Sequence, residues 1–323
     1  MRRTSDNLNP QPWRSLYPFE SCWFDAPLGR LHFIDESSGQ NPDDARSALL
    51  FVHGNPTWSF HWRALVAALR AQYRCVAVDH LGCGLSDKPS RLLRLEDHVD
   101  QLTALVEHLD LRGVTLVAQD WGGAIGLGAM LRSSERLRRI VLFNTGAFPP
   151  RSIPWQIRVC RLPVVGRLAV AGGGLFNRAA LRMTLARRAR LESAVAAGYL
   201  APYRSWSDRR AVYGFVRDIP TGPRHPTWRT LAAIESQLPT LADRPALLVW
   251  GMRDWCFRPD CLERFEHVWP RAEVHRLADV GHWVLEDAPD EVLPLVEHFL
   301  ANTEFNPHAT ERSESTEARA MQS

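Results

Sequence analysis

Short, nearly continuous apolar runs alternate with helix-like stretches along most of the chain. The apolar runs predict buried strands at residues 48–53, 75–79, 114–118, 140–144 and 246–250, with a further candidate at 273–277. The stretches between them predict helices at residues 60–70, 95–109, 122–132 and 291–300. This alternation predicts an α/β fold with a doubly wound, mostly parallel sheet.

The alternation stops between about residues 148 and 238, where no strong strand pattern is present and several Pro and Trp residues occur. We expect this segment to form a helical cap over the carboxyl ends of the strands, where open α/β sheets bind their ligands. The core is then expected at residues 16–147 and 239–300. The polar ends, residues 1–15 and 301–323, are expected to be mobile.

The composition narrows the class of protein. The 323 residues are 45% hydrophobic and 23% charged, as in a globular protein with a large core, and the net charge of +3 is too small to indicate nucleic-acid binding. No apolar run of about 18 residues suggests a membrane span, and residues 1–12 do not resemble a signal peptide. Six cysteines show neither a CxxC pair nor metal-ligand spacing, so we expect a cytoplasmic protein with reduced thiols.

The first part of the expected cap is strongly basic. Residues 151–190 contain nine arginines and no acidic residue. One interpretation is a solvated helix face. The other is a docking surface for an acidic protein partner, a second copy of the chain or an anionic lipid interface. The sequence leaves both interpretations open.

The most informative motif is Asp120-Trp121-Gly122-Gly123, which follows the apolar run at 114–118 and opens a helical stretch of small residues. This strand–turn–helix context is typical of a nucleophile elbow, which usually presents a serine. Here Asp120 takes that place. A carboxylate that attacks carbon leaves an ester on the enzyme, which suits displacement at an alkyl carbon or a strained ring better than peptide or ester hydrolysis.

Two further residues complete a candidate triad. Asp254 follows the predicted strand at 246–250, and His282 follows the candidate strand at 273–277. The chain order of nucleophile, acid and histidine is that of the α/β-hydrolase triad. Each residue alone would be an ordinary surface side chain, but three of them at strand ends in this order predict a catalytic set of Asp120, Asp254 and His282.

Candidate anion-binding groups lie in two loops. The segment 53–58, His-Gly-Asn-Pro-Thr-Trp, follows a predicted strand and is placed to supply one oxyanion-hole N–H, and Trp121 supplies the second. The side chains of Asn55 and Trp121 also carry N–H groups that can donate to a departing anion. The structural alternatives are a turn asparagine before proline and a core tryptophan.

These motifs, together with Ser86-Asp87-Lys88-Pro89, resemble the haloalkane dehalogenase family over about residues 16–300. The resemblance implies an α/β-hydrolase fold with Asp120 as nucleophile, His282 as base, and Asn55 with Trp121 as the halide-binding pair. Some members of the family carry the catalytic acid as a glutamate after the sixth strand. Residues 143–148 have no carboxylate here, so the resemblance assigns the acid to Asp254.

Three further segments narrow the resemblance. Residues 201–206, 215–220 and 285–289 are similar to the third dehalogenase subfamily, which includes the decarboxylases that convert a long-chain cis-3-alkyl-4-alkyloxetan-2-one, a β-lactone, into an alkene and carbon dioxide. Both reactions would use the same residues, and neither needs a metal or an organic cofactor. The sequence thus predicts a haloalkane dehalogenase-type hydrolase acting on a small apolar substrate, with the β-lactone decarboxylase as the alternative.

Two other interpretations are an epoxide hydrolase, which is a close rival, and a non-enzymatic module, which belongs to a different functional class. An epoxide hydrolase also uses an elbow aspartate, with cap tyrosines as donors, and Tyr199, Tyr203 and Tyr213 lie in the expected cap. Asn55 weighs against it, because an epoxide releases no free anion. A non-enzymatic hydrolase-fold binding module is opposed by the intact triad.

The run of three glycines at residues 172–174 does not indicate a phosphate-binding loop. It lacks the strand, the helix and the lysine that such a loop requires.

Overall fold

One eight-stranded sheet forms the centre of the molecule in the computed structural model, which describes residues 11–37, 48–188 and 190–303. The strand order is β1-β2-β4-β3-β5-β6-β7-β8. β1 and β2 pair antiparallel with their neighbours, and the strands from β4 to β8 are parallel. The predicted mostly parallel α/β sheet is therefore confirmed. The strands are β1 (Cys22–Ala26), β2 (Gly29–Glu36), β3 (Ala48–Val52), β4 (Arg74–Val78), β5 (Val114–Asp120), β6 (Leu137–Thr145), β7 (Ala246–Gly251) and β8 (Glu273–Leu277).

The apolar runs form strands because both faces of the sheet are covered. In β3, Leu50 and Val52 face one buried cluster, and Leu49 and Phe51 face the other. A strand buried on both sides has no polar face, so its sequence is apolar throughout. The edge strand β1 alternates half-buried and exposed residues, and its short mixed pattern was not predicted as a strand.

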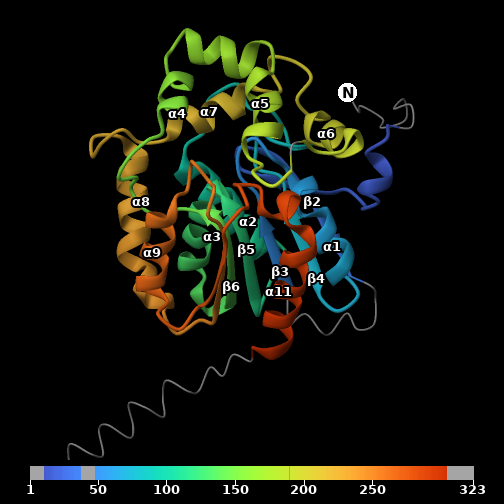
Figure 1. Ribbon diagram of the computed structural model, residues 1–323, viewed down its shortest axis with the longest axis vertical. Coiled ribbons are helices and arrows are strands. Elements are labelled where there is room, and N and C mark those ends of the chain that lie inside the picture. Colours follow the sequence, from blue (N-terminus) through green and yellow to red (C-terminus); the bar gives the residue numbers. More distant parts are fainter. Residues whose placement is uncertain (1–10, 38–47, 189, 304–323) are drawn as a thin grey trace, which may run out of the picture.

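Helices cover both faces of the sheet (Figure 1). Residues of α2, α3, α8 and α9 belong to one buried cluster, and residues of α1 and α11 belong to the other. The helices predicted at 60–70, 95–109, 122–132 and 291–300 correspond to the 3-10 turn η2 (Ser59–Trp62) with α1 (Arg63–Leu69), α2 (Leu95–His108), α3 (Trp121–Arg132) and α11 (Pro289–Asn302). Two others, α9 (Pro259–Val268) and α10 (Val284–Asp287), were not predicted individually.

The segment between β6 and β7 is helical and lies over the carboxyl ends of the strands, at the top of Figure 1. It contains α4 (Trp155–Cys160), the π-helical turn η4 (Arg167–Gly172), α5 (Leu175–Met183), α6 (Ser193–Leu200), α7 (Arg210–Asp218) and α8 (Pro226–Gln237). The last of these, α8, descends beside the sheet, where Leu231 and Ile234 join the cluster of α2 and α3. The helical insertion therefore contributes to the core as well as to the cap.

The amino-terminal segment that is predicted to be mobile includes one buried side chain. Trp13 is only 3% exposed and packs edge-on against Trp58 and Phe60. The 3-10 turn η1 (Arg14–Leu16) follows it directly. Residues 1–10 and 304–323 lie outside the described part of the chain. None of the helices that the structure describes has the length and apolarity needed to cross a membrane.

Candidate active site

Asp120 lies at the junction of β5 and α3, in a sharp elbow with φ 54° and ψ −128°. Residues other than glycine rarely adopt a positive φ, and such strain persists only where the surroundings hold it in place. At two glycines near the elbow, the backbone passes too close to neighbouring atoms to leave room for a side chain. A β-carbon on Gly54 would overlap the Asp120 carboxylate, and one on Gly122 would overlap the Val52 carbonyl. The small residues beside Asp120 are thus needed for the turn to pack against β3.

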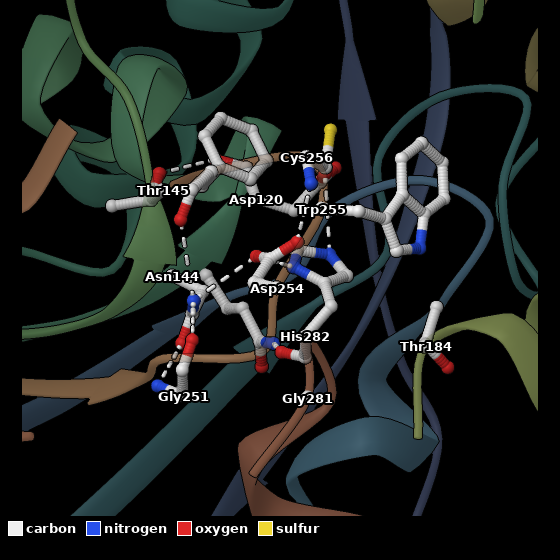
Figure 2. A network of polar contacts seen from close by, with 12 residues as sticks. Asp120, Asn144, Thr145, Thr184, Gly251, Asp254, Trp255, Cys256, Gly281 and His282 are labelled. Atoms are coloured by element: carbon white, nitrogen blue, oxygen red, sulfur yellow. Dashed lines mark hydrogen bonds and ion pairs between the residues drawn. The ribbon is translucent and has the colours of Figure 1, made fainter. Parts of the chain in front are cut away.

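The structure brings the three predicted triad residues together (Figure 2). The Asp120 Oδ2 atom lies 3.5 Å from His282 Nε2, and His282 Nδ1 lies 2.7 Å from Asp254 Oδ2. Asp254 is buried, and its carboxylate accepts hydrogen bonds from Asn144 Nδ2 at 3.0 Å and from the backbone N–H of Cys256 at 2.6 Å. These donors hold Asp254 against His282 in one orientation.

The histidine of this set is positively charged at neutral pH. Burial alone would lower the pKa of His282, but the negative charge of Asp254 and hydrogen bonds with Asp120 and Asp254 raise it to about 10. An imidazolium cannot remove a proton from water. Since the Asp120 charge contributes to the raised pKa, converting that carboxylate to a neutral ester would move the pKa of His282 back toward the range of a base.

The two oxygens of Asp120 have different surroundings. Oδ1 accepts a hydrogen bond of 2.7 Å from the backbone N–H of Asn55, as expected for the loop after β3. Oδ2 faces His282. One oxygen is therefore fixed by a donor, and the other is next to the imidazolium.

The two predicted anion-binding side chains both line the cavity beside Asp120. The Asn55 side-chain amide donates one hydrogen bond of 3.2 Å to the Val212 carbonyl of α7, which leaves its second N–H unused. The half-buried Trp121 indole N–H has no partner among the described residues. Two side chains that line the same cavity as Asp120 thus each carry an N–H group without a partner among the described residues.

The cavity between core and cap has a volume of about 360 Å³. Its wall is mainly apolar. The cap supplies most of the apolar side chains, and Ala124 of α3 belongs to the core: Ile157, Phe176, Val216, Phe148, Leu231 and Ala124 are among the lining residues. Pockets of this size hold drug-sized molecules and bury most of their surface. Asp120 and His282 are among the few charged groups that an apolar ligand would meet there.

The three cap tyrosines do not reach this cavity. The Tyr199 hydroxyl donates to Glu286 at 2.6 Å, the Tyr203 hydroxyl to the Thr57 carbonyl at 2.8 Å, and the Tyr213 hydroxyl to the Pro163 carbonyl at 3.3 Å. None of the three lines the cavity. They are therefore not placed to donate to the oxygen of a bound epoxide.

Comparisons with known proteins agree with this geometry. Residues 47–289 match the model of the alpha/beta hydrolase fold family. A cis-3-alkyl-4-alkyloxetan-2-one decarboxylase from Shewanella oneidensis is 37% identical over 90% of this chain and 91% of its own length. The chain belongs to the α/β-hydrolase fold family.

Other relatives place the chain more narrowly within this family. Haloalkane dehalogenase 2 from Mycobacterium bovis is 35% identical and covers 91% of this chain and 99% of the dehalogenase. The crystal structure of the haloalkane dehalogenase DatA from Agrobacterium tumefaciens superposes with a TM-score of 0.76 at 25% identity, over 87% of this chain and 96% of that one. This α/β-hydrolase is thus an enzyme related to both dehalogenases and decarboxylases.

The hydrolase also contains a buried polar network that sequence reasoning missed. Gln119, the residue before the elbow, donates through its amide to the backbone carbonyl of His282. Its Oε1 atom lies 2.5 Å from His61 Nε2, and His61 Nδ1 lies 2.7 Å from the Tyr199 hydroxyl. Tyr199 in turn bonds Glu286, which is paired with Arg63. The network joins the loop that carries His282 to cap helix α6.

Only one weak signal in the sequence pointed to this network. Polar residues inside apolar runs are unusual, and Gln119 directly follows the apolar run at 114–118. His61 lies within a predicted helix, and Tyr199 and Glu286 lie far from it along the chain. Nothing in their local patterns indicates that they meet.

Proposed function

We propose that the chain is a haloalkane dehalogenase-type hydrolase in which Asp120 is the nucleophile. The observation that carries this proposal is the pairing of a carboxylate at the elbow with two free N–H donors, from Asn55 and Trp121, in one apolar cavity. A nucleophilic oxygen and donors for a departing anion are the two requirements of displacement at an alkyl carbon.

In the first step Asp120 Oδ2 forms a bond to the carbon that carries the halogen. The carbon–halogen bond breaks with both its electrons, and the halide leaves toward the N–H groups of Asn55 and Trp121. The product is an alkyl ester of Asp120, whose carbonyl oxygen Oδ1 accepts the Asn55 backbone N–H. No base is needed for this step, which agrees with a protonated His282 in the resting enzyme.

In the second step His282 acts as the base. Esterification removes the negative charge of Asp120, so the pKa of His282 falls and its proton can leave. The neutral imidazole then takes a proton from water, and the hydroxide adds to the Asp120 carbonyl carbon. The negative charge that develops on Oδ1 is stabilised by the Asn55 backbone N–H. The bond from the Asp120 carboxyl carbon to the alkyl oxygen then breaks, and the alkoxide takes a proton from His282 and leaves as the alcohol. The new carboxyl group returns a proton to His282, which restores both charges. Asp254 holds the ring and balances its charge.

A second candidate reaction uses the same first step on a cis-β-lactone. Asp120 attacks the saturated ring carbon C4, the bond between C4 and the ring oxygen breaks, and a carboxylate is released on the neighbouring carbon C3. That carboxylate then leaves as carbon dioxide, its bonding electrons form the alkene, and Asp120 leaves as a carboxylate. No water is consumed, so this reaction needs no base and His282 transfers no proton in it.

Two observations favour the β-lactone as the natural substrate. Relatives from Shewanella oneidensis and Xanthomonas campestris, each 37% identical, are cis-3-alkyl-4-alkyloxetan-2-one decarboxylases. The apolar cavity of about 360 Å³ is also larger than a short haloalkane needs. Long alkyl chains bind in such a cavity through burial of apolar surface, at about 25 cal/mol per Å².

One comparison of substrates tests both reactions. The purified enzyme is offered a series of 1-bromoalkanes, a long-chain cis-β-lactone and a styrene-type epoxide, and bromide, alkene and diol are measured on the same preparation. We expect slow bromide release over a broad range of chain lengths and a higher kcat/KM for alkene formation. The control is Asp120→Asn, an isosteric change to a poor nucleophile, which should abolish both activities.

The possible outcomes separate the proposals. Fast bromide release without alkene would leave a dehalogenase alone, and alkene without bromide would leave a decarboxylase alone. Activity above a few per cent in Asp120→Asn, with no deamidation detected by mass spectrometry, would contradict the covalent mechanism. Diol formation from the epoxide without either other product would assign the site to epoxide hydrolysis.

A further inference from the structure

The outer surface of the cap exposes an unusual amount of apolar side chain. Nine of the twelve large hydrophobic residues that are exposed in the described chain lie between residues 155 and 206. Trp155 is 71% exposed and Val164 is 69% exposed. We call six of these residues the cap surface: Trp155, Val159, Leu162, Val164, Val165 and Leu168. They belong to α4, η4 and the turn between α4 and η4.

Apolar side chains of these elements also point the other way. Ile157 and Cys160 of α4 and Ala169 of η4 line the cavity that holds Asp120. One layer of helices therefore has an inner face that forms the substrate cavity and an outer face of exposed apolar side chains. This layer lies at the edge of the molecule farthest from the amino ends of the strands (Figure 1).

The same surface carries positive charge without counter-charge. Arg151, Arg158, Arg167, Arg178 and Arg182 are exposed, and none of them forms an ion pair with a described residue. By contrast, several exposed arginines of the core lie beside carboxylates, such as Arg132 with Glu96 and Asp100. No acidic residue occurs from 151 to 190.

A second feature of this surface points to an anionic ligand. Beside α4 lies a cleft of about 540 Å³ that is lined by Arg151, Arg158, Arg161, Arg217 and Trp228, with no acidic side chain in its wall. Arg161 and Arg217 are anchored there by hydrogen bonds to backbone carbonyls. Guanidinium groups held in a cleft suit the phosphate of a lipid headgroup, because they bind its oxygens in pairs.

We propose that the cap surface docks this enzyme onto an anionic lipid bilayer. A bilayer offers negative charge at its surface and hydrocarbon directly beneath, and an interfacial protein meets it with basic residues, tryptophan and aliphatic side chains together. An acidic protein partner would satisfy the arginines but would leave the exposed aliphatic side chains in contact with water or charge. The cap surface has both kinds of side chain within one short segment.

Docking in this orientation places the bilayer on the outer side of the helices whose inner side forms the cavity. A water-insoluble substrate would then pass from the bilayer to Asp120 through a single layer of helices. This last consequence rests on the proposed function, whereas docking itself does not.

The test is flotation of the purified full-length chain with lipid vesicles. One set of vesicles is phosphatidylcholine alone, and the other is an equimolar mixture of phosphatidylcholine and phosphatidylglycerol. We expect binding to the anionic vesicles only, and weaker binding as salt rises. Each basic residue near an anionic surface contributes about fivefold in affinity, so Arg158→Glu/Arg178→Glu should weaken binding at least about 25-fold. Val164→Ser/Leu168→Ser should weaken it as well.

A matched charge reversal provides the control. Arg112 and Arg271 are exposed and lie just before β5 and β8, at the end of the sheet opposite the cap. Arg112→Glu/Arg271→Glu changes the net charge equally and should leave vesicle binding within about twofold of wild type, since charges beyond a Debye length of about 10 Å are screened. None of the exchanged residues lines the main cavity, so turnover of a water-soluble bromoalkane should be unchanged in every variant.

Three results would overturn the proposal. The first is wild-type protein that floats with neither set of vesicles. The second is binding that the control variant loses as much as the cap variants do. The third is self-association in gel filtration that Val164→Ser/Leu168→Ser abolishes while vesicle binding is absent, which would make the cap surface an interface between copies of the chain. Circular dichroism and the unchanged bromoalkane turnover show that each variant is folded.

Discussion

At the scale of single residues, the charge state of His282 divides the chemistry into two stages. Its pKa of about 10 makes it a cation between Asp120 and Asp254 before substrate reacts. Displacement by Asp120 needs no base, whereas hydrolysis of the resulting ester does. The proposed base function of His282 therefore begins only after Asp120 has lost its charge.

His282→Phe should trap the covalent intermediate when a bromoalkane is supplied. Asp120 can still form the ester, but no group remains to activate water. Intact mass spectrometry should show one alkyl adduct per chain, and peptide mapping should place it on Asp120. Asp120→Asn/His282→Phe is the control and should stay unmodified. An unmodified His282→Phe protein after long incubation with bound substrate would argue for an earlier role of His282.

Trp121→Phe should isolate the contribution of one hydrogen bond. The change keeps an aromatic ring and removes the indole N–H, and loss of one donor to a developing anion typically lowers the rate about 10²- to 10³-fold. The matched control is Trp255→Phe, because Trp255 also lines the cavity but its N–H donates to the Met183 carbonyl at 2.9 Å. Bromide release within threefold of wild type for Trp121→Phe would mean that Trp121 only packs.

At the scale of elements, the site is assembled from strand ends and fastened to the cap. β5, β7 and β8 deliver Asp120, Asp254 and His282 to the same edge of the sheet. Cap helix α6 is attached to this edge through Tyr199, whose ring stacks on Trp283 at 4.5 Å between centroids. Its hydroxyl reaches the buried Glu286. The Tyr199 side chain thus contacts the segment that carries His282.

Tyr199→Phe should weaken this attachment while keeping the stacked ring. The hydroxyl lies within hydrogen-bond distance of both His61 and Glu286, and loss of a buried hydrogen-bond partner costs about 1–3 kcal/mol. The free energy of unfolding is measured in urea. Tyr213→Phe is the matched control, since its hydroxyl makes a longer bond of 3.3 Å to Pro163, and we expect a loss below about 1 kcal/mol. Equal losses in the two variants would contradict the role of the network.

At the scale of the whole molecule, two buried carboxylates connect segments that are far apart in the chain. Asp79 is fully buried and bonds His32 Nδ1 at 2.9 Å and the backbone N–H groups of Ser59 and Leu85, each at 2.7 Å. Glu286 is paired with Arg63. Burial would raise both carboxyl pKa values, but the charges of His32 and Arg63 and the hydrogen bonds hold them below their usual range.

These pKa values predict loss of stability in acid. A carboxyl whose pKa is lower in the folded state stabilises the fold above its unfolded pKa of about 4, and this contribution disappears as the pH falls toward the folded value. The free energy of unfolding should therefore decrease steadily below about pH 5. Asp79→Asn should be less stable at pH 7, with a shallower decrease in acid. A slope equal to that of wild type in this variant would exclude Asp79 as a cause.

The division of the chain into a core at 16–147 and 239–300 and a cap at 148–238 stays a prediction, and so does a cytoplasmic location. The position of α8 beside α2 and α3 shows why such a boundary is difficult to draw from sequence. A helix that packs on the core and a helix that covers the cavity have similar local patterns.

The sequence by itself determined the order of the six parallel strands in the chain, the elbow at Asp120, the candidates Asp254 and His282, and the basic cap. Each of these depends on neighbours in the chain: a run of apolar residues, a strand followed by small residues, or a group of arginines without acids. Because parallel strands end at one edge of a sheet, chain order alone also indicated that the three triad candidates would lie close together.

Only the tertiary structure decided the properties that depend on distance and burial between remote residues. It joined Gln119 to His61 and Tyr199, turned the three cap tyrosines away from the cavity, and separated the inner from the outer side of α4 and η4. It also placed His282 between two carboxylates and so set its charge. A pKa depends on the charges and solvent around a group, and residues far apart in the chain supply both, so no local pattern could contain this information.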